Sequence, residues 1–250
     1  MEREELKIHG IVQGVGFRPF IHKLVQEFGL RGFIKNTSSG VELELEGERD
    51  TLERFTAALP LRAPKLAVIE SIEAEYTAEL KNYPDFKILK SKTEAFRDTL
   101  ISPDICICDD CLRELRDRND RRYKYPFINC TNCGPRFTII KDVPYDRCKT
   151  SMSEFPMCPD CDREYHDIED RRYHAQPDCC PVCGPQVFFL DAEGKRLEGD
   201  AIELAREYVK DGKIIAVKGL GGMHLACSCS DGDIALRLRR RKQRDEKPFA

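Results

Sequence analysis

Residues 10–20 read GIVQGVGFRPF and join an alternating apolar segment to a pattern with helical period. Upstream, Leu6 and Ile8 alternate with polar residues, which predicts a half-buried strand. The closely spaced glycines then interrupt the alternation. We place the start of the following helix at Pro19, because its fixed φ suits a first helical turn, and the end at Gly29.

The segments that follow have the order of a small α+β domain. Residues 31–36 and 41–46 have the pattern of two strands joined by a turn, residues 51–59 have helical periodicity, and residues 67–76 and 86–89 supply at least one further strand. The order β-α-β-β-α-β is that of the ferredoxin-like fold. We therefore predict a ferredoxin-like domain over residues 1–92, long enough to bury a core of its own.

The glycine-rich turn suits a phosphate group. It joins the predicted strand to a helix N-terminus, where consecutive backbone N–H groups and the helix dipole attract an anion. Gly14 and Gly16 allow close approach of the backbone and positive φ. Arg18 adds a planar, charged fork that matches phosphate oxygens. Taken alone, the motif could also be an ordinary turn with an exposed arginine.

The wider pattern resembles the acylphosphatase family. It comprises Gly-x-Val-Gln-Gly-Val-x-Phe-Arg at 10–18 and Gly-x-x-x-Asn-x-x-x-Gly-Val at 32–41, within a resemblance that covers residues 4–91. The resemblance implies that Asn36 orients the attacking water. It also implies a phosphate-binding loop of Gln13, Gly14, Val15, Gly16, Phe17 and Arg18. Gly16 stands where some stand-alone members carry a bulkier residue. This difference would change the substrate preference and leave the phosphate-binding loop intact.

The thirteen cysteines all lie between Cys106 and Cys229. The chain has no apolar run of about 18 residues, and its acidic N-terminus lacks the apolar core of a signal peptide. These features predict a cytoplasmic protein without a membrane segment, and disulfides are rare in the cytoplasm. A dense cysteine cluster there indicates metal ligation, with disulfides as the alternative.

Two copies of a four-cysteine pattern follow one another at an offset of 50 residues. The predicted metal ligands are Cys108, Cys111, Cys130 and Cys133 in the first copy and Cys158, Cys161, Cys180 and Cys183 in the second. Four thiolates suit a closed, structural Zn²⁺ site, and zinc contributes about 10–16 kcal/mol of apparent binding energy to small modules. We predict zinc fingers at 106–146 and 147–197, after a linker at 93–105.

Some ligand choices remain open from spacing alone. A mononuclear iron site is chemically possible. Cys106 and Cys148 fall outside the repeated pairs, as does Cys179, which abuts Cys180; the register of the repeat favours Cys180. The spare candidates His166 and His174 are expected on the polar surface.

The repeats also contain paired arginines, at 121–122 and 171–172, which would suit nucleic acid. Acidic residues beside each pair, such as Asp120 and Asp170, argue against a nucleic-acid partner. The small net charge of -3 likewise demands neither a nucleic-acid nor a membrane partner.

From residue 198 the composition changes again. We expect a helix at 201–209, one strand at 214–217, a glycine-rich loop at 219–222 and a basic helix at 234–241. One strand cannot complete a covered sheet, so residues 198–250 are interpreted as the start of a larger domain. The basic run at 237–247 would ordinarily be a solvated face.

This last part resembles the start of a YrdC-like nucleotide-binding domain. The resemblance implies that Lys242 and Arg244 contact nucleotide phosphates, with Lys218 near the same cleft.

The order of the three parts, together with NCTNCGPRF at 129–137, resembles the HypF family of carbamoyltransferases in [NiFe] hydrogenase maturation. The resemblance implies that carbamoyl phosphate is hydrolysed at the acylphosphatase site. The YrdC-like domain would then form carbamoyl-adenylate from ATP with Mg²⁺, and a TsaD-like domain would transfer the carbamoyl group to a HypE-type partner for cyanide-ligand synthesis. The family carries most of these last two domains beyond the length of this chain, so we expect only the first step here.

Two other functions remain open. One is a general acylphosphatase with a zinc-stabilised appendage and no role in hydrogenase maturation. The other is a zinc-dependent binding module in which the phosphate loop is inactive.

Overall fold

A computed structural model describes residues 1–91, 100–230, 232–244 and 246–249, so most of the predicted linker at 93–105 lies outside the described residues. The chain divides into two units, Met1–Pro185 and Gln186–Ala250. The domain boundaries predicted within these units remain predictions.

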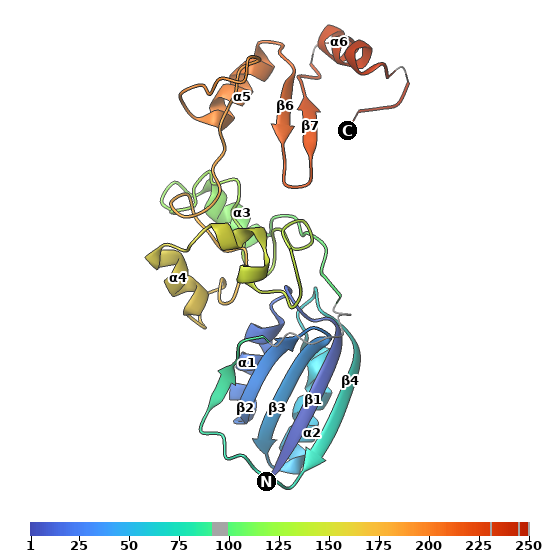
Figure 1. The fold of residues 1–250 in the computed structure, drawn as a ribbon, viewed down its shortest axis with the longest axis vertical. Coiled ribbons are helices and arrows are strands. Elements are labelled where there is room, and N and C mark those ends of the chain that lie inside the picture. Colours follow the sequence, from blue (N-terminus) through green and yellow to red (C-terminus); the bar gives the residue numbers. More distant parts are fainter. Residues whose placement is uncertain (92–99, 231, 245, 250) are drawn as a thin grey trace. The chain divides into compact units, whose positions relative to one another are not determined.

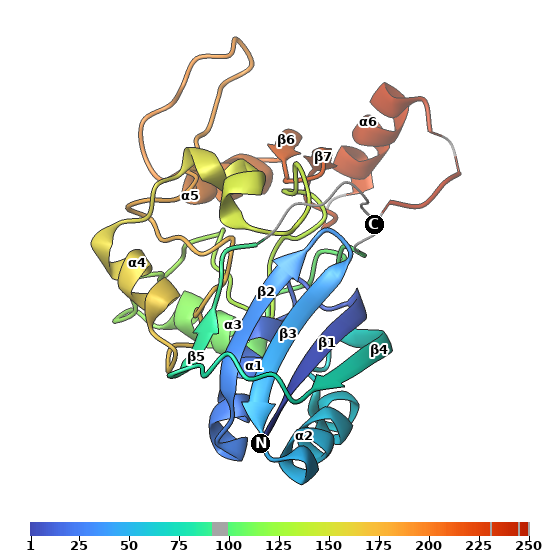
Figure 2. The same ribbon diagram turned by 60° about the horizontal axis from the view of Figure 1, so that its bottom comes forward.

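The first unit begins with a five-stranded sheet and two helices (Figure 1). The elements are β1 (Glu2–Ile11), α1 (Phe17–Phe28), β2 (Arg31–Thr37), β3 (Gly40–Gly47), α2 (Arg49–Arg62), β4 (Val68–Thr77) and β5 (Phe86–Ile88). The strand order is β4-β1-β3-β2-β5, in which β5 runs parallel to β2 and the other neighbours are antiparallel. Figure 2 shows β5 at one edge and β4 at the other. The predicted ferredoxin-like order is confirmed, with β5 as an additional edge strand.

Alternation along the strands sends apolar side chains to the face that α1 and α2 cover (Figure 1). The buried core comprises Leu6, Ile8, Val12, Val15, Phe17, Ile21, Leu24, Val25, Leu30, Ile34, Val41, Leu43, Leu45, Leu52, Phe55 and Leu59. This core fixes the end of β1 and the start of α1, and therefore the loop between them.

Helix α1 begins at Phe17, two residues before the start expected at Pro19, and ends before Gly29 as predicted. Gly16 has a φ of 74° and breaks the extended path of the chain, so the helix can begin directly after it. A proline has no N–H to donate, and the first four N–H groups of a helix lack internal partners, so Pro19 fits within the first turn.

The cysteine-rich region contains few regular elements. Its two α-helices, α3 (Asp109–Arg116) and α4 (Pro159–His166), each begin directly after a cysteine, Cys108 and Cys158 respectively. Short 3₁₀ turns at Arg147–Lys149 and Ser151–Glu154 follow the first finger. A small buried cluster combines cysteines with Tyr125, Ile128, Ile139 and Met152.

The second unit contains α5 (Ala201–Lys210), β6 (Ile215–Lys218), β7 (Met223–Ala226) and α6 (Gly232–Lys242). The expectation of one strand was wrong, because β7 pairs antiparallel with β6. The loop at 219–222 is a hairpin turn in which the Gly219 N–H donates to the Gly222 carbonyl at 2.8 Å. Three of the four residues of β7 are exposed, so no buried alternation marked this strand in the sequence.

No helix among the residues that the structure describes is long and apolar enough to cross a membrane.

Two glycines of the first domain, Gly32 in β2 and Gly29 after α1, differ in how far they tolerate a side chain. Gly32 has a φ of 146°, and a Cβ there would lie 1.8 Å from the Glu44 carbonyl oxygen. We expect Gly32→Ala to destabilise the sheet by roughly 3 kcal/mol. Gly29→Ala, at a φ of 66° with open space around it, should cost only about 1 kcal/mol. Hydrogen exchange of β3 amides would measure the loss of stability in each variant. Equal losses of protection in Gly32→Ala and Gly29→Ala would contradict this prediction.

Candidate functional site

The glycine-rich loop lies between β1 and the N-terminus of α1, where the helix dipole favours an anion. Gly14 and Gly16 have φ values of 71° and 74°, which ordinary residues adopt only at a cost. The Phe20 N–H donates to the Gly16 carbonyl at 3.1 Å and closes the first turn of α1. The loop therefore combines two features that favour an anion, positive-φ glycines and a helix N-terminus.

Arg18 lies in the first turn of α1 and is only 9% exposed. It lines a small cavity together with loop residues that include Gly14 and Gly16. Its Nη1 atom forms an ion pair with the Asp146 Oδ1 atom at 3.2 Å. The predicted phosphate ligand is thus buried at the predicted loop and held by a carboxylate from the cysteine-rich region.

Asn36 lies near the end of β2, paired with Val41 of β3, which in turn pairs with Ile8 of β1. The residue is 1% exposed, and among the described residues its Oδ1 atom has no hydrogen-bond partner. A buried amide oxygen without a protein partner costs free energy unless water or a ligand supplies the missing bond. Asn36 does not line the Arg18 cavity, although it lies at the end of the sheet from which the loop leads into α1 and Arg18.

The Gln13 side chain links the loop to the β2–β3 turn. Its Nε2 atom donates to the carbonyls of Thr37 and Gly40, both at 2.8 Å, and its Oε1 atom accepts from the Tyr145 N–H at 2.8 Å. The side chain is therefore occupied, and only the backbone of Gln13 is available to a phosphate.

The other wall of the cavity comes from the fingers, which the sequence did not reveal. It is formed by Thr131, Arg136, Tyr145, His174, Ala175, Gln176 and Pro177. The Arg136 Nε atom donates to the Gly14 carbonyl. A Cβ at Gly14 would lie 3.1 Å from Arg136 and 3.2 Å from the Tyr145 ring, so the glycine also permits this close packing.

His174 was expected on the polar surface, and the structure shows that this was wrong. It lines the cavity, and its Nδ1 atom is buried without a partner among the described residues. Burial, with the nearby positive charge of Arg18, lowers the pKa of His174 to about 3, so the ring is neutral at physiological pH. Lys124, its equivalent in the first repeat, is exposed, so the repeats differ where the second one meets the loop. His166 is exposed, as expected.

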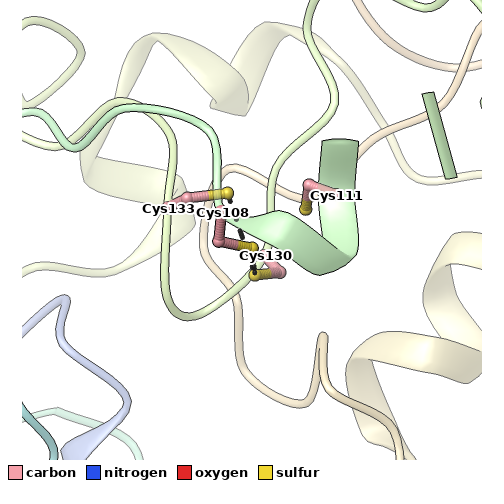
Figure 3. Close-up of side chains that lie close together, drawn as sticks. All are labelled: Cys108, Cys111, Cys130 and Cys133. Carbon is pink, nitrogen blue, oxygen red and sulfur yellow. Dashed lines mark hydrogen bonds between the residues drawn. The ribbon is translucent and has the colours of Figure 1, made fainter. Parts of the chain in front are cut away.

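The eight predicted cysteine ligands come together in two groups of four, and all four sulfur atoms of each group lie within 4.8 Å of one another. Figure 3 shows the first group around the start of α3. Its Cys108–Cys130 and Cys130–Cys133 sulfur distances are 3.7 and 3.9 Å. In the second group the Cys158–Cys180 and Cys183–Cys161 distances are 3.7 and 3.6 Å.

These distances fit zinc and exclude disulfides. A tetrahedral Zn²⁺ with Zn–S bonds of about 2.3 Å separates its sulfur ligands by about 3.8 Å, whereas a disulfide needs about 2.0 Å. Cys180 belongs to the second group. Cys179 instead lies 3.5 Å from the Tyr125 hydroxyl and is buried. Cys106 and Cys148 are exposed outside both groups.

The paired arginines bind the two fingers to each other. Arg121 and Arg122 of the first repeat each reach Glu164 of the second at 2.6 Å, and Arg171 and Arg172 of the second reach Glu114 of the first. Burial opposes ionisation of Glu164, but hydrogen bonds from Arg122 and Arg121 outweigh it and lower the pKa to about 2. Because these arginines are engaged within the protein, the nucleic-acid alternative loses its main support.

The guanidinium groups also contact the cysteines of the opposite finger. Arg171 Nη1 lies 3.1 Å from the Cys111 sulfur, and Arg121 Nη2 lies 3.2 Å from the Cys161 sulfur. Each finger thus donates a hydrogen bond to a predicted metal ligand of the other, which supports the thiolate form.

The three residues predicted to contact nucleotide lie in the second unit. Lys218 ends β6 and Lys242 ends α6, and both are exposed. The Arg244 guanidinium lies 5.6 Å from the centre of the Phe249 ring. Within the described part of this unit, Lys218 does not contact Lys242 or Arg244, so the nucleotide-binding roles of the three residues remain predictions.

Metal analysis will test the two cysteine groups. We expect the purified chain to hold two zinc ions, and Cys130→Ser to hold about one, because three thiolates and a serine hydroxyl bind Zn²⁺ weakly. Cys106→Ser is the matched control and should retain both ions. A single zinc ion in the unaltered chain would contradict the assignment of two sites.

The depressed pKa of His174 has a consequence for stability. The unfolded state takes up a proton near pH 6.5 and the folded state only near pH 3. Stability is therefore complete above pH 6.5 and falls as the pH decreases, by about 2 kcal/mol between pH 7 and pH 5. In urea unfolding, His174→Gln should lose this part of the pH dependence, whereas the exposed control His166→Gln should retain it. Equal pH dependence in all three proteins would refute a half-buried, neutral His174.

Three family models match the chain, in the order of its parts. The acylphosphatase model matches residues 4–88, and the HypF finger model matches residues 107–140 and 157–190. The Sua5/YciO/YrdC model, described as telomere recombination, matches residues 207–250. The acylphosphatase of Archaeoglobus fulgidus is 38% identical over 85 residues, which are 34% of this chain and 93% of that protein.

Longer relatives match the chain throughout. Carbamoyltransferase HypF2 of Cupriavidus necator is 50% identical over 99% of this chain and 31% of the relative. A crystal structure of full-length HypF in the phosphate- and nucleotide-bound form matches with a TM-score of 0.93 and 50% identity, over 100% of this chain and 32% of that one. The chain thus spans about a third of the length of these relatives. The chain thus carries acylphosphatase, HypF-finger and YrdC-like segments in this order, and over its whole length it is about 50% identical to part of the HypF proteins.

Proposed function

We propose that this chain hydrolyses an acyl phosphate at the loop of residues 13–18, with carbamoyl phosphate as the substrate. The observation that carries the proposal is the placement of Arg18 in the wall of a cavity at the N-terminus of α1. Asn36, at the same end of the sheet, has a buried amide oxygen without a protein partner.

In this mechanism the loop N–H groups and the Arg18 guanidinium hold the phosphoryl oxygens and offset the charge that develops on them. The Asn36 Oδ1 atom accepts a hydrogen bond from water and orients the water oxygen towards phosphorus. Attack by that oxygen breaks the bond between phosphorus and the acyl oxygen, and the products are inorganic phosphate and carbamate. The mechanism requires no protein nucleophile.

Zn²⁺ has a structural role in the proposal. Each of the two groups of four cysteines would hold one ion, and four thiolates leave no open position for substrate. The ions would supply folding energy to a region whose buried apolar cluster is small. None of the thirteen cysteines forms a disulfide in the structure, which agrees with a cytoplasmic location.

The later steps belong to the whole family architecture. We propose that the second unit contributes Lys218, Lys242 and Arg244 to binding ATP with Mg²⁺ for carbamoyl-adenylate formation. Transfer to a HypE-type partner, for cyanide-ligand synthesis in [NiFe] hydrogenase maturation, would follow. The full-length relatives, named as carbamoyltransferases, support this larger role.

Phosphate release from carbamoyl phosphate tests the first step. We expect Arg18→Ala to reduce kcat/KM by on the order of 10³-fold, because the variant lacks the charge that stabilises the transition state. Asn36→Ala should cost on the order of 10²-fold through loss of water positioning. Arg62→Ala, which removes an exposed arginine paired with Glu27, is the control and should leave the rate unchanged.

A comparison with acetyl phosphate separates the candidate functions. Preference for carbamoyl phosphate supports the HypF role, and equal rates would favour a general acylphosphatase. No release from folded, zinc-loaded protein would refute the activity and leave a binding module as the remaining candidate.

A further inference from the structure

The ion pair between Arg18 and Asp146 connects two parts of the chain that are far apart in sequence. Arg18 belongs to the acylphosphatase-like domain, and Asp146 directly precedes the 3₁₀ turn Arg147–Lys149 of the cysteine-rich region. Their side chains are 10% and 22% exposed. A partly buried pair is screened less by solvent than the exposed pairs elsewhere on this chain.

The direction of the contact leaves part of the guanidinium available. Asp146 engages Nη1, and it is not among the residues that line the cavity, whereas Arg18 is. Within the described residues, no protein acceptor bonds to Nε or Nη2 of Arg18. A guanidinium has five donors in a rigid fork, so a carboxylate on one nitrogen leaves two others for phosphate oxygens.

Asp146 is itself held on both sides. The preceding Tyr145 N–H donates to Gln13 Oε1 at 2.8 Å, which ties this segment to the phosphate loop. The following Arg147 side chain donates to the carbonyls of Gln176 and Asp178 at 2.8 and 2.7 Å. A carboxylate on a segment anchored at both ends has a defined position, so it can define the position of its partner.

We propose that Asp146 is a positioning residue for acyl phosphate hydrolysis, which holds the Arg18 guanidinium so that its free N–H groups face the phosphoryl group. The proposal rests on the proposed function and extends it. The phosphate-binding arginine lies in the acylphosphatase-like domain, and its orientation comes from the finger region. A long arginine side chain without this partner would sample several rotamers, and misplacement by about 1 Å can cost 10²-fold in rate.

The opposite role for the same contact is competition, in which Asp146 takes the place of the phosphate and blocks the site. The geometry disfavours it, because a competing carboxylate would have to lie in the cavity that the loop and Arg18 line. The two roles predict opposite effects of removing the charge.

The test uses the full, zinc-loaded chain and the variants Asp146→Asn, Asp146→Glu and Asp142→Asn. Asp142 lies in the same segment and pairs with Lys149 at 3.5 Å, so it is a matched control for the loss of one carboxylate. We expect Asp146→Asn to lower kcat for carbamoyl phosphate by about 10- to 100-fold, with a smaller change in KM. Asp146→Glu should recover part of that loss, and Asp142→Asn should show none.

A double variant separates positioning from a general structural role. In the Arg18→Ala background, Asp146→Asn should reduce the residual rate less than twofold, because Asp146 acts through Arg18 alone. The proposal would be overturned if Asp146→Asn reduced the rate in the Arg18→Ala background by as large a factor as it does in the unaltered chain. It would also be overturned by an Asp146→Asn variant that matches Asp142→Asn, or by one that is faster than the unaltered chain.

Calorimetry can measure the affinity for inorganic phosphate, a quantity that does not depend on turnover. We expect Asp146→Asn to weaken phosphate binding about tenfold at unchanged zinc content and melting temperature. If the unaltered chain binds phosphate through Arg18 but releases none from carbamoyl phosphate, the proposed function fails and the weakened binding still supports the positioning role. Tighter phosphate binding by Asp146→Asn, or no binding by the unaltered chain, would overturn it.

Discussion

Residues 100–185 depend on two groups of four cysteine sulfur atoms, because their other buried side chains form only a small cluster. Sulfur distances of 3.6–3.9 Å match the edges of a tetrahedron around Zn²⁺. Each group joins the start of a short helix to a loop about twenty residues further on, so the metal ligands set the path of the chain between them. The segments that reach the phosphate loop, around Arg136 and Tyr145, emerge from this framework.

The duplication explains why the two fingers form one body. Each copy carries an Arg-Arg pair and a glutamate, and each arginine pair binds the glutamate of the other copy. Buried guanidinium groups need partners. The reciprocal exchange supplies them together with the buried carboxylate of Asp178, which pairs with both Arg122 and Arg172. The copies then diverge at Lys124 and His174, of which only the second lines the cavity with Arg18. A repeated scaffold has thus acquired one face that packs on the phosphate loop.

Two separate requirements act on the phosphate loop, the binding of an anion and the packing of the fingers. Its positive-φ glycines and its place before α1 are the features that favour an anion, as proposed for the phosphate loop. Contacts from Arg136 and Tyr145 also require the absence of a side chain at Gly14. In the proposed function the same glycine serves both phosphate binding and the packing of the fingers. The catalytic geometry proposed for the loop then depends on residues more than a hundred positions away.

The sequence alone determined the ferredoxin-like order, the two four-cysteine groups and the place of Arg18 beside the glycine-rich loop, because alternation, spacing and glycine placement are local signals. Asn36 was singled out only by the resemblance to acylphosphatases. It missed the early start of α1, where Gly16 matters more than Pro19, and the exposed strand β7, which has no buried alternation. Only the tertiary structure showed that Asp146 meets Arg18, that His174 is enclosed and neutral, and that the arginine pairs exchange partners. Each of these depends on two surfaces that pack together, and no periodicity within one segment records which distant segment covers it.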